Sequence, residues 1–383
     1  MGLQGIRPSV STDPRNWEAE AKKALSANAF GYVAGGAGER ATMDSNRAAF
    51  RKWSILPRML QGNTHRDLSV ELFGRKYPNP LLMAPVGVNK IFHNDGEQEC
   101  SVPYIMSTAA SASIEEMAAA SDGHKWFQLY WPMRKDDDIT ISMLQRAQKA
   151  GVEVLVVTLD LWALSWRPAD LDNAYVPFFL GIGDQIGFSD PVFQKKYQQQ
   201  SGKSIEDDVR AAAMNWEGVV FSGEAHKWED LELLKANWKG PIVLKGIQTV
   251  EDANLAVQHG MDGIIVDNHG GRQYDGAVGS LDMLPEIVDA VGDKLTVLFG
   301  SGIRTGADVM KAIALGAKAC LVGRPIIYGL AADGEAGATH VLKCMLADLD
   351  MNLGLVGLTS CRDLKRNILR RNEGFLPHAA TSN

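Results

Sequence analysis

A histidine and an arginine stand three positions apart in residues 266–273, whose sequence is VDNHGGRQ. The segment completes the apolar run GIIV, and two glycines separate His269 from Arg272. A histidine can take up a proton near neutral pH, and an arginine can bind a carboxylate through two parallel hydrogen bonds. Glycines allow the backbone to pass close to a ligand. The segment therefore predicts a base and an anion-binding group at the end of a buried strand.

Eight short apolar runs that would supply such strands recur along the chain. They cover residues 80–88, 103–108, 126–131, 152–160, 241–247, 263–268, 295–302 and 319–325. Amphipathic helical patterns such as ISMLQRAQKAG and ADVMKAIALGAK lie between them. Continuous apolar strands separated by helices are typical of parallel strands buried on both faces. Eight such units predict an α/β fold, a (β/α)8 TIM barrel, rather than an open doubly wound sheet.

The spacing of these units predicts a single domain, residues 1–383, built on a barrel over 80–335. Residues 1–79 form an N-terminal extension, with a helix expected over NWEAEAKKALS and a glycine-rich segment, YVAGGAGER, and residues 336–383 are expected to form C-terminal helices. About 80 residues separate the fourth and fifth strands, so we expect 162–240 to form a lid and a linking helix. Only about 14 residues separate the first two strands, with GEQEC as their sole helical material, which barely suffices for a crossover.

Nearly every predicted strand has a polar residue or a glycine at its carboxyl end, where barrel enzymes carry their chemistry. These residues are Ser107, Thr108, Gln128, Tyr130, Thr158, Asp160, Lys245, His269, Arg272, Gly302, Arg304, Gly323 and Arg324. Any one of them alone is more often structural, but their recurrence at one rim favours an active site. The last two ends, GSGIRTGADV and VGRP, combine glycines, helix N-termini and arginines, which suits a phosphate.

Composition excludes several classes of function. The 383 residues are 45% hydrophobic and 22% charged, as in ordinary globular proteins, and the formal charge of −7 comes without a basic stripe for nucleic acid. No apolar run reaches the roughly 18 residues of a membrane span. The four cysteines lack metal-binding spacing, and no targeting signal is recognisable. We therefore expect a cytoplasmic protein without a metal ion, a nucleic-acid partner or a membrane partner.

The segments YVAGGAGE, FQLYW, TLD with WRP, LKGIQ, NHGGRQ, GSGIRTGADV and GRP resemble the FMN-dependent L-2-hydroxy acid oxidase and dehydrogenase family. The resemblance runs from about residue 16 to about residue 371. Within the family, LDLWALSWRPADL, SDPVFQKKY and HKWEDL are most similar to lactate 2-monooxygenase. The resemblance implies FMN as cofactor, a small 2-hydroxy acid and O₂ as substrates, and assembly into a homo-oligomer, a tetramer or an octamer.

The resemblance also implies a catalytic set. His269 would be the base, and Asp160 would stabilise the imidazolium that forms. Substrate would be held by two arginines and two tyrosines: Arg272 and Arg167 would bind its carboxylate, and Tyr32 and Tyr130 would hydrogen-bond its carboxylate and reacting hydroxyl. Lys245 would lie beside the flavin N1 edge, where a positive charge favours the anionic reduced ring.

A second set of positions would bind FMN. Those implied for the ring, its polar edge and the phosphate are, in chain order, Ala84, Pro85, Ser107, Gln128, Thr158, Lys245, Ser301, Gly302, Arg304, Gly323 and Arg324.

Three features depart from the family pattern. Gly300 stands where the family has an aspartate that holds the ribityl hydroxyls, and Asp267 replaces the usual serine before Asn-His. Most of the first barrel helix is also missing. The loss of one cofactor anchor predicts weakened FMN binding, which Gly300→Asp would be expected to strengthen.

The sequence leaves four functions open. A lactate 2-monooxygenase-like enzyme would convert the hydroxy acid and O₂ to the acid one carbon shorter, carbon dioxide and water, and the long lid favours this interpretation. A peroxide-releasing L-2-hydroxy acid oxidase would use the same residues. So would a dehydrogenase that passes electrons to a protein or a quinone, although no cytochrome domain or membrane segment is recognisable. A flavin-depleted, inactive paralogue could instead act as a binding protein, an interpretation motivated by Gly300 and the short first barrel helix. Ala109 follows Ser107-Thr108 where some relatives carry a bulky aromatic residue, so the substrate side chain could exceed a methyl group.

Overall fold

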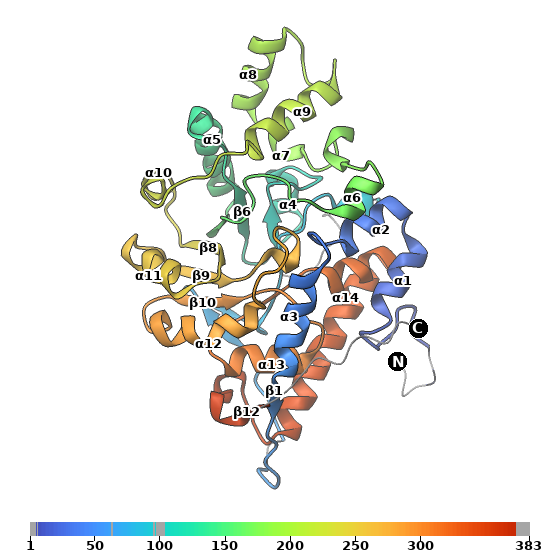
Figure 1. Ribbon diagram of the computed structural model, residues 1–383, viewed down its shortest axis with the longest axis vertical. Helices are drawn as coiled ribbons and strands as arrows, with labels where there is room; N and C mark the ends of the chain where they lie inside the picture. Colours follow the sequence, from blue (N-terminus) through green and yellow to red (C-terminus); the bar gives the residue numbers. More distant parts are fainter. Residues whose placement is uncertain (1–4, 6, 63, 95, 97–103, 373–383) are drawn as a thin grey trace.

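A parallel β-barrel forms the centre of the protein in the computed structural model, which describes residues 5, 7–62, 64–94, 96 and 104–372 (Figure 1). Its strands are β4 (Leu81–Met83), β5 (Ile105–Ser107), β6 (Trp126–Tyr130), β7 (Val154–Thr158), β8 (Ile242–Ile247), β9 (Gly263–Val266), β10 (Thr296–Phe299) and β11 (Cys320–Val322). They neighbour one another in the order β4-β11-β10-β9-β8-β7-β6-β5, and a parallel bridge between Met83 and Tyr104 joins the two ends. The predicted eight-stranded barrel is confirmed.

The barrel helices cover the outside of these strands. They are α4 (Ile114–Ala119), α5 (Asp137–Lys149), α10 (Leu231–Asn237), α11 (Val250–Gln258), α12 (Ser280–Val291), α13 (Gly306–Ala314) and the start of α14 (Arg324–Leu355). Every residue of β6 and β7 is buried, as continuous apolar runs require. Local signals set the helix starts: Ser113 and Thr305 each form a capping box at the N-terminus of α4 and α13.

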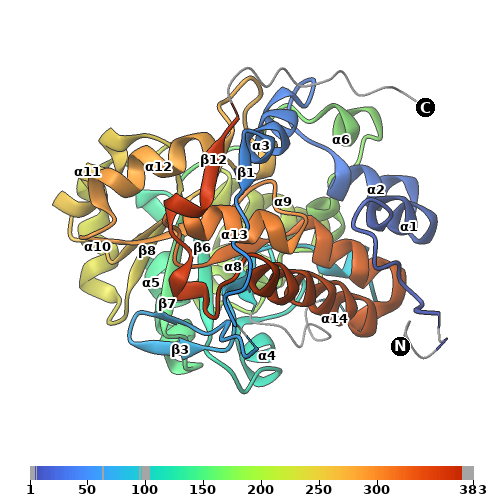
Figure 2. The same ribbon diagram turned by 90° about the horizontal axis from the view of Figure 1, so that it is seen from below.

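The N-terminal extension packs against the C-terminal part of the chain. It contains α1 (Trp17–Ala24), α2 (Ala27–Ala34), α3 (Ala41–Arg51), β1 (Trp53–Ile55) and the hairpin β2 (Val70–Leu72) and β3 (Arg75–Tyr77). Strand β1 pairs with β12 (Leu369–Arg371), so segments from opposite ends of the chain lie side by side (Figure 2). The C-terminal segment that we expected to be helical thus also contains a strand, after the 3-10 turns η8 (Cys361–Asp363) and η9 (Arg366–Ile368). Helix α14 itself is broken at Asp333 and Gly334.

The insertion between β7 and β8, the fourth and fifth barrel strands, is mostly helical. It contains α6 (Pro168–Asp172), η5 (Pro177–Leu180), α7 (Gln185–Phe188), α8 (Pro191–Ser201), α9 (Val209–Val220) and η6 (Trp228–Asp230), ahead of α10. These elements form the upper part of the molecule in Figure 1. Phe193 and Trp216 pack edge to face at 5.0 Å between ring centroids, which joins α8 to α9 within the hydrophobic core of the protein.

GEQEC was predicted to supply the only helical material between the first two barrel strands, and most of it lies outside the described residues. The described part of this connection contains the 3-10 turn η2 (Asn89–Ile91). In the portion of the chain that the structure describes, no helix is long and apolar enough to cross a membrane.

Candidate active site

One cavity, with an empty volume of about 1020 Å³, opens at the carboxyl ends of the barrel strands. Most of the predicted site residues line it, namely Tyr32, Ala84, Pro85, Tyr130, Arg167, Lys245, His269, Arg272, Ser301, Gly302, Arg304, Gly323 and Arg324. Barrel closure therefore brings together residues that lie up to 292 positions apart in the sequence.

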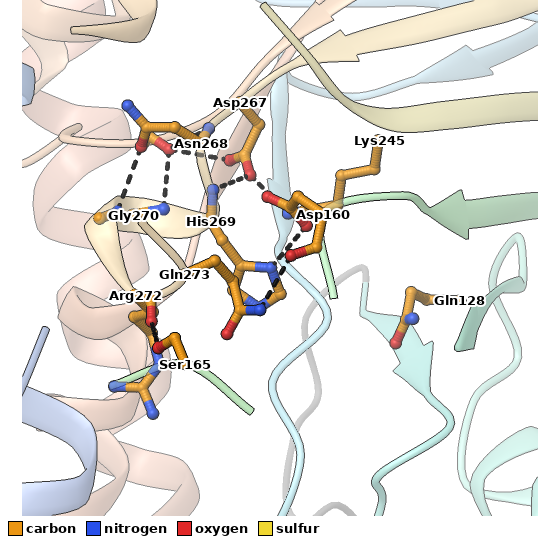
Figure 3. Close-up of polar contacts among 12 residues, drawn as sticks. Gln128, Asp160, Ser165, Lys245, Asp267, Asn268, His269, Gly270, Arg272 and Gln273 are labelled. Atoms are coloured by element: carbon orange, nitrogen blue, oxygen red, sulfur yellow. Dashed lines mark hydrogen bonds and ion pairs between the residues drawn. The ribbon is translucent and has the colours of Figure 1, made fainter. Parts of the chain in front are cut away.

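The other four predicted residues do not line this cavity. Asp160 and Thr158 line a second cavity instead. Ser107 and Gln128 are fully buried at the ends of β5 and β6, where the Ser107 hydroxyl donates to Gln128 Oε1 at 3.1 Å. Figure 3 shows Gln128 apart from the other labelled residues. Its Nε2 has no hydrogen-bond partner among the described residues, which leaves one buried amide donor unsatisfied.

His269 and Asp160 meet across two strand ends (Figure 3). Nδ1 of the histidine lies 2.9 Å from Oδ1 of Asp160, and the two side chains are only 14% and 5% exposed. Because a carboxylate accepts at Nδ1, the ring proton lies there and Nε2 keeps its lone pair. Burial lowers the pKa of His269 below its usual value, although Asp160 acts in the opposite direction. Burial raises the pKa of Asp160, but the charges of His269 and Lys245 outweigh it and lower that pKa.

The NHGG turn holds the histidine in a fixed position. The side-chain amides of Asn268 and Asn46 exchange two hydrogen bonds of 2.8 Å, which tie the turn to α3. His269 has a φ of 58°, a sparsely populated conformation for a residue with a side chain. At Gly271 φ is 73°, and an added Cβ would lie 2.7 Å from Met43 Cγ. The turn therefore needs glycine at 271 to approach α3 this closely.

Two arginines and a tyrosine form one wall of the cavity. Nε of Arg167 donates to the backbone oxygen of Arg272 at 2.9 Å, and Nη1 of Arg272 donates to the backbone oxygen of Tyr32 at 2.6 Å. The guanidinium of Arg272 also lies 4.9 Å from the centroid of the Tyr32 ring. Burial, followed by the charge of Arg272, lowers the pKa of Arg167 to about 10. Two cations held together in this way favour an anionic ligand.

The sequence did not identify the residues that position Arg167. The Ser165 hydroxyl donates to the backbone oxygen of Arg272 at 2.5 Å, and Nη2 of Arg167 donates to Oε1 of Gln273 at 2.5 Å. Ser165 lies two residues before Arg167, and Gln273 directly follows Arg272, so their proximity in sequence was the only available signal.

A second pair of arginines lies towards the ends of β10 and β11. The guanidinium of Arg324 donates to the backbone oxygens of Val33, Gly270 and Gly35 at 2.8 to 2.9 Å. Burial and the neighbouring Arg272 lower the pKa of Arg324 to about 9, and burial also lowers the pKa of Arg304. Among the described residues, no carboxylate forms an ion pair with either guanidinium. Partly buried cations without such partners mark this end of the cavity as an anion site.

Lys245 forms a buried ion pair with Asp267, a residue absent from the predicted site. Nζ lies 2.5 Å from Oδ1, and the side chains are 5% and 7% exposed. Burial lowers the pKa of Lys245, but the charges of Asp267 and Asp160 reverse that effect and raise it. A β-bulge between Lys245 and Ile247 changes the register of β8 with β9 at this point.

No group of three or more His, Cys, Asp or Glu side chains in the described chain is placed to hold a metal ion.

Comparison with known proteins identifies relatives over nearly the whole chain. Residues 21–371 match the FMN-dependent dehydrogenase family. The chain is 53% identical to an FMN-dependent alpha-hydroxy acid dehydrogenase of Penicillium citrinum, covering 95% of this chain and 92% of that protein. It is 42% identical to an L-lactate oxidase of Lysinibacillus sphaericus, covering 92% and 90%. A crystal structure of a mandelate oxidase is 34% identical and superposes with a TM-score of 0.81, covering 96% and 100%.

Proposed function

Since the chain belongs to the FMN-dependent dehydrogenase family and is an FMN-dependent oxidoreductase, we propose that it oxidises an L-2-hydroxy acid with an apolar side chain larger than methyl. The observation that carries this proposal is the placement of a buried histidine–carboxylate pair beside two arginines. His269 and Arg272 line one cavity, and Asp160 supports the histidine from behind. We set aside the alternative of a flavin-free binding protein, because the family and its FMN-dependent relatives indicate a working flavoenzyme.

The residues of the cavity fit FMN. Arg304 and Arg324, partly buried and without carboxylate partners among the described residues, would bind its phosphate together with backbone near Gly302 and Gly323. The unsatisfied Nε2 of Gln128 offers one further donor to a polar edge of the cofactor. FMN supplies an acceptor for the electron pair that leaves the substrate.

The protein groups would bind and deprotonate the substrate. Arg167 and Arg272 would hold its carboxylate, which fixes the hydroxyl-bearing carbon relative to the base. Burial raises the pKa of both Tyr32 and Tyr130, so these phenols stay protonated and can donate hydrogen bonds. Nε2 of His269 would accept the proton that the hydroxy acid loses. The negative charge of Asp160 would stabilise the imidazolium that results.

The apolar part of the cavity supports a side chain larger than a methyl group. Ala109 lines it where a bulkier residue would reduce the space, and the other apolar lining residues include Phe92, Leu161, Leu164, Phe178 and Phe221. Four of these five, Leu161, Leu164, Phe178 and Phe221, lie in the segment between β7 and β8. Anaerobic mixing with a series of L-2-hydroxy acids that differ only in side-chain length tests the proposal. We expect the rate of flavin bleaching, divided by the substrate concentration, to be higher for acids with side chains longer than that of lactate. A maximum at the two-carbon or three-carbon acid would contradict the proposal.

The insertion also supports a monooxygenase outcome. It is joined to the site by hydrogen bonds from Gly38 N–H to the backbone oxygen of Trp166 at 3.0 Å and from Ser165 to Arg272. A lid attached in this way would delay product release. O₂ would take up the electron pair and two protons to give hydrogen peroxide. The peroxide would then react with the retained 2-keto acid inside the cavity and give the acid one carbon shorter, carbon dioxide and water.

Product analysis separates the two outcomes. With catalase absent, we expect the shortened acid and carbon dioxide in equal amounts, with little free peroxide. Stoichiometric peroxide and keto acid would establish the alternative, a peroxide-releasing oxidase. A variant with α8 and α9 deleted tests the lid directly, since it should release more peroxide per turnover.

A further inference from the structure

Asp267 and Gly300 occupy the same space at the ends of β9 and β10. A Cβ added to Gly300 would overlap Oδ2 of Asp267 and lie 3.1 Å from its Cγ. A side chain at 300 and the carboxylate at 267 therefore exclude each other. The two departures from the family pattern, a glycine at 300 and an aspartate at 267, are one coupled change in three dimensions.

Three protein donors hold the Asp267 carboxylate in place. Oδ1 accepts from Lys245 Nζ at 2.5 Å and from the backbone N–H of His269 at 2.6 Å. Oδ2 accepts from the Ser301 hydroxyl at 3.0 Å. Ser301 is itself fixed, because its Oγ accepts the backbone N–H groups of Asn268 and Gly270. Such a network leaves the carboxylate little freedom to turn away.

One acceptor position of this carboxylate remains open. A carboxylate offers about four lone-pair sites, and the three donors leave one on Oδ2. Asp267 is 5% exposed and lines the first cavity together with Ser301 and Gly302. The open position therefore suits a hydroxyl donor of a molecule bound in that cavity.

We propose that Asp267 is a cofactor-binding residue that accepts a hydrogen bond from the ribityl chain of FMN and replaces the carboxylate missing at position 300. The inference rests on the placement of FMN proposed above. It reverses the expectation from the sequence that Gly300 leaves the cofactor without an anchor. The expected effect of Gly300→Asp on FMN affinity is reversed as well. This substitution should weaken FMN binding, because it would place a second carboxylate against that of Asp267.

A double-mutant cycle tests whether Asp267 replaces the carboxylate missing at position 300. The quantity measured is FMN affinity, by calorimetric titration of the apoprotein without substrate. Asp267→Ser should weaken FMN binding on the order of ten- to a hundredfold, since a charge-assisted hydrogen bond is lost. Gly300→Asp should also weaken it, through overlap and like-charge repulsion. The double variant, Asp267→Ser with Gly300→Asp, should bind FMN far more tightly than either single variant. Asp252→Ser, the same chemical change in the second cavity, should leave the affinity unaltered.

Two results would overturn the proposal. One is an unchanged FMN affinity in Asp267→Ser, and the other is a double variant that binds no better than Asp267→Ser. If Gly300→Asp alone fails to fold but the double variant folds and binds FMN, the overlap is supported by the rescue. Asp267→Asn keeps the side-chain volume and should still bind more weakly than the wild type. If the wild-type protein binds FMN but no hydroxy acid bleaches the bound flavin, the result would contradict the proposed function and leave the proposal for Asp267 intact.

Discussion

The imidazole of His269 and the carboxylate of Asp160 lie 2.9 Å apart, Nδ1 to Oδ1, although 109 residues separate them in the chain. The carboxylate contacts the ring at Nδ1 and does not line the first cavity, since His269 lines that cavity and Asp160 lines the second one. Asp160 can thus orient the base and balance its charge without contacting the substrate.

Replacing the base should stop flavin reduction and spare the fold. In His269→Gln the amide fills a similar volume but cannot take up the proton, so we expect bound FMN and no bleaching by hydroxy acid. Stopped-flow absorbance under anaerobic conditions measures the rate, and the flavin spectrum of the purified variant is the control. Bleaching as fast as in the wild type would show that another group is the base.

Removing the charge behind the base should slow the reaction without abolishing it. Asp160→Asn leaves the imidazolium without its counter-charge, and we expect flavin reduction to slow by about a hundred- to a ten-thousandfold. Substrate affinity should change little, because Asp160 does not line the cavity that would hold substrate. A large rise in the substrate concentration needed for half-maximal bleaching would argue that Asp160 positions the arginines instead.

The depressed pKa of His269 predicts the pH dependence. Burial lowers this pKa below its usual value, and only the neutral ring can accept a proton. The value of kcat/KM should therefore be constant above the usual histidine range and fall as the pH decreases through the lowered pKa. In Asp160→Asn the acid limb should move to still lower pH, because Asp160 raises the pKa of His269. An acid limb that moves to higher pH in this variant would contradict the assignment.

The arginine pair should determine substrate affinity. Arg272→Lys keeps the charge but loses the planar fork, so we expect KM to rise by about ten- to a hundredfold with a smaller change in kcat. Arg366→Lys is a matched control, since Arg366 lies on the surface in an ion pair with Asp289. An unchanged KM in Arg272→Lys would remove the residue from the substrate clamp.

Breaking the buried Lys245–Asp267 pair should destabilise the protein. Lys245→Met leaves a buried carboxylate without its ammonium partner, a loss of about 3–5 kcal/mol in the free energy of unfolding. Adding Asp267→Asn to that variant should restore much of the loss, because the unpaired charge disappears. Urea unfolding of the three apoproteins measures both effects, and purely additive losses would show that the pair is not coupled.

Much of the fold and part of the site could be predicted from local patterns. Continuous apolar runs and capping residues such as Thr305 depend on near neighbours in sequence, and they identified the barrel and its order of elements. Because parallel strands direct their carboxyl ends to one rim, residues such as Tyr130, Lys245 and His269 could be assigned to one cavity from the sequence. That inference needed only the strand ends and the closure of the sheet.

Contacts across strand ends were decided by the tertiary structure. From the sequence alone, Gly300 indicated a missing cofactor anchor and Asp267 was an unexplained substitution. The structure shows that a side chain at position 300 would overlap the Asp267 carboxylate, so the two substitutions depend on each other. Likewise, Ser107 and Gln128 lie at strand ends but do not line the first cavity, whereas Phe178 of the insertion does. Strand-end position fixes which rim a residue reaches. The direction and depth of its side chain depend on bulges, on turns such as NHGG and on how the insertion packs, and these are set by residues far apart in the chain.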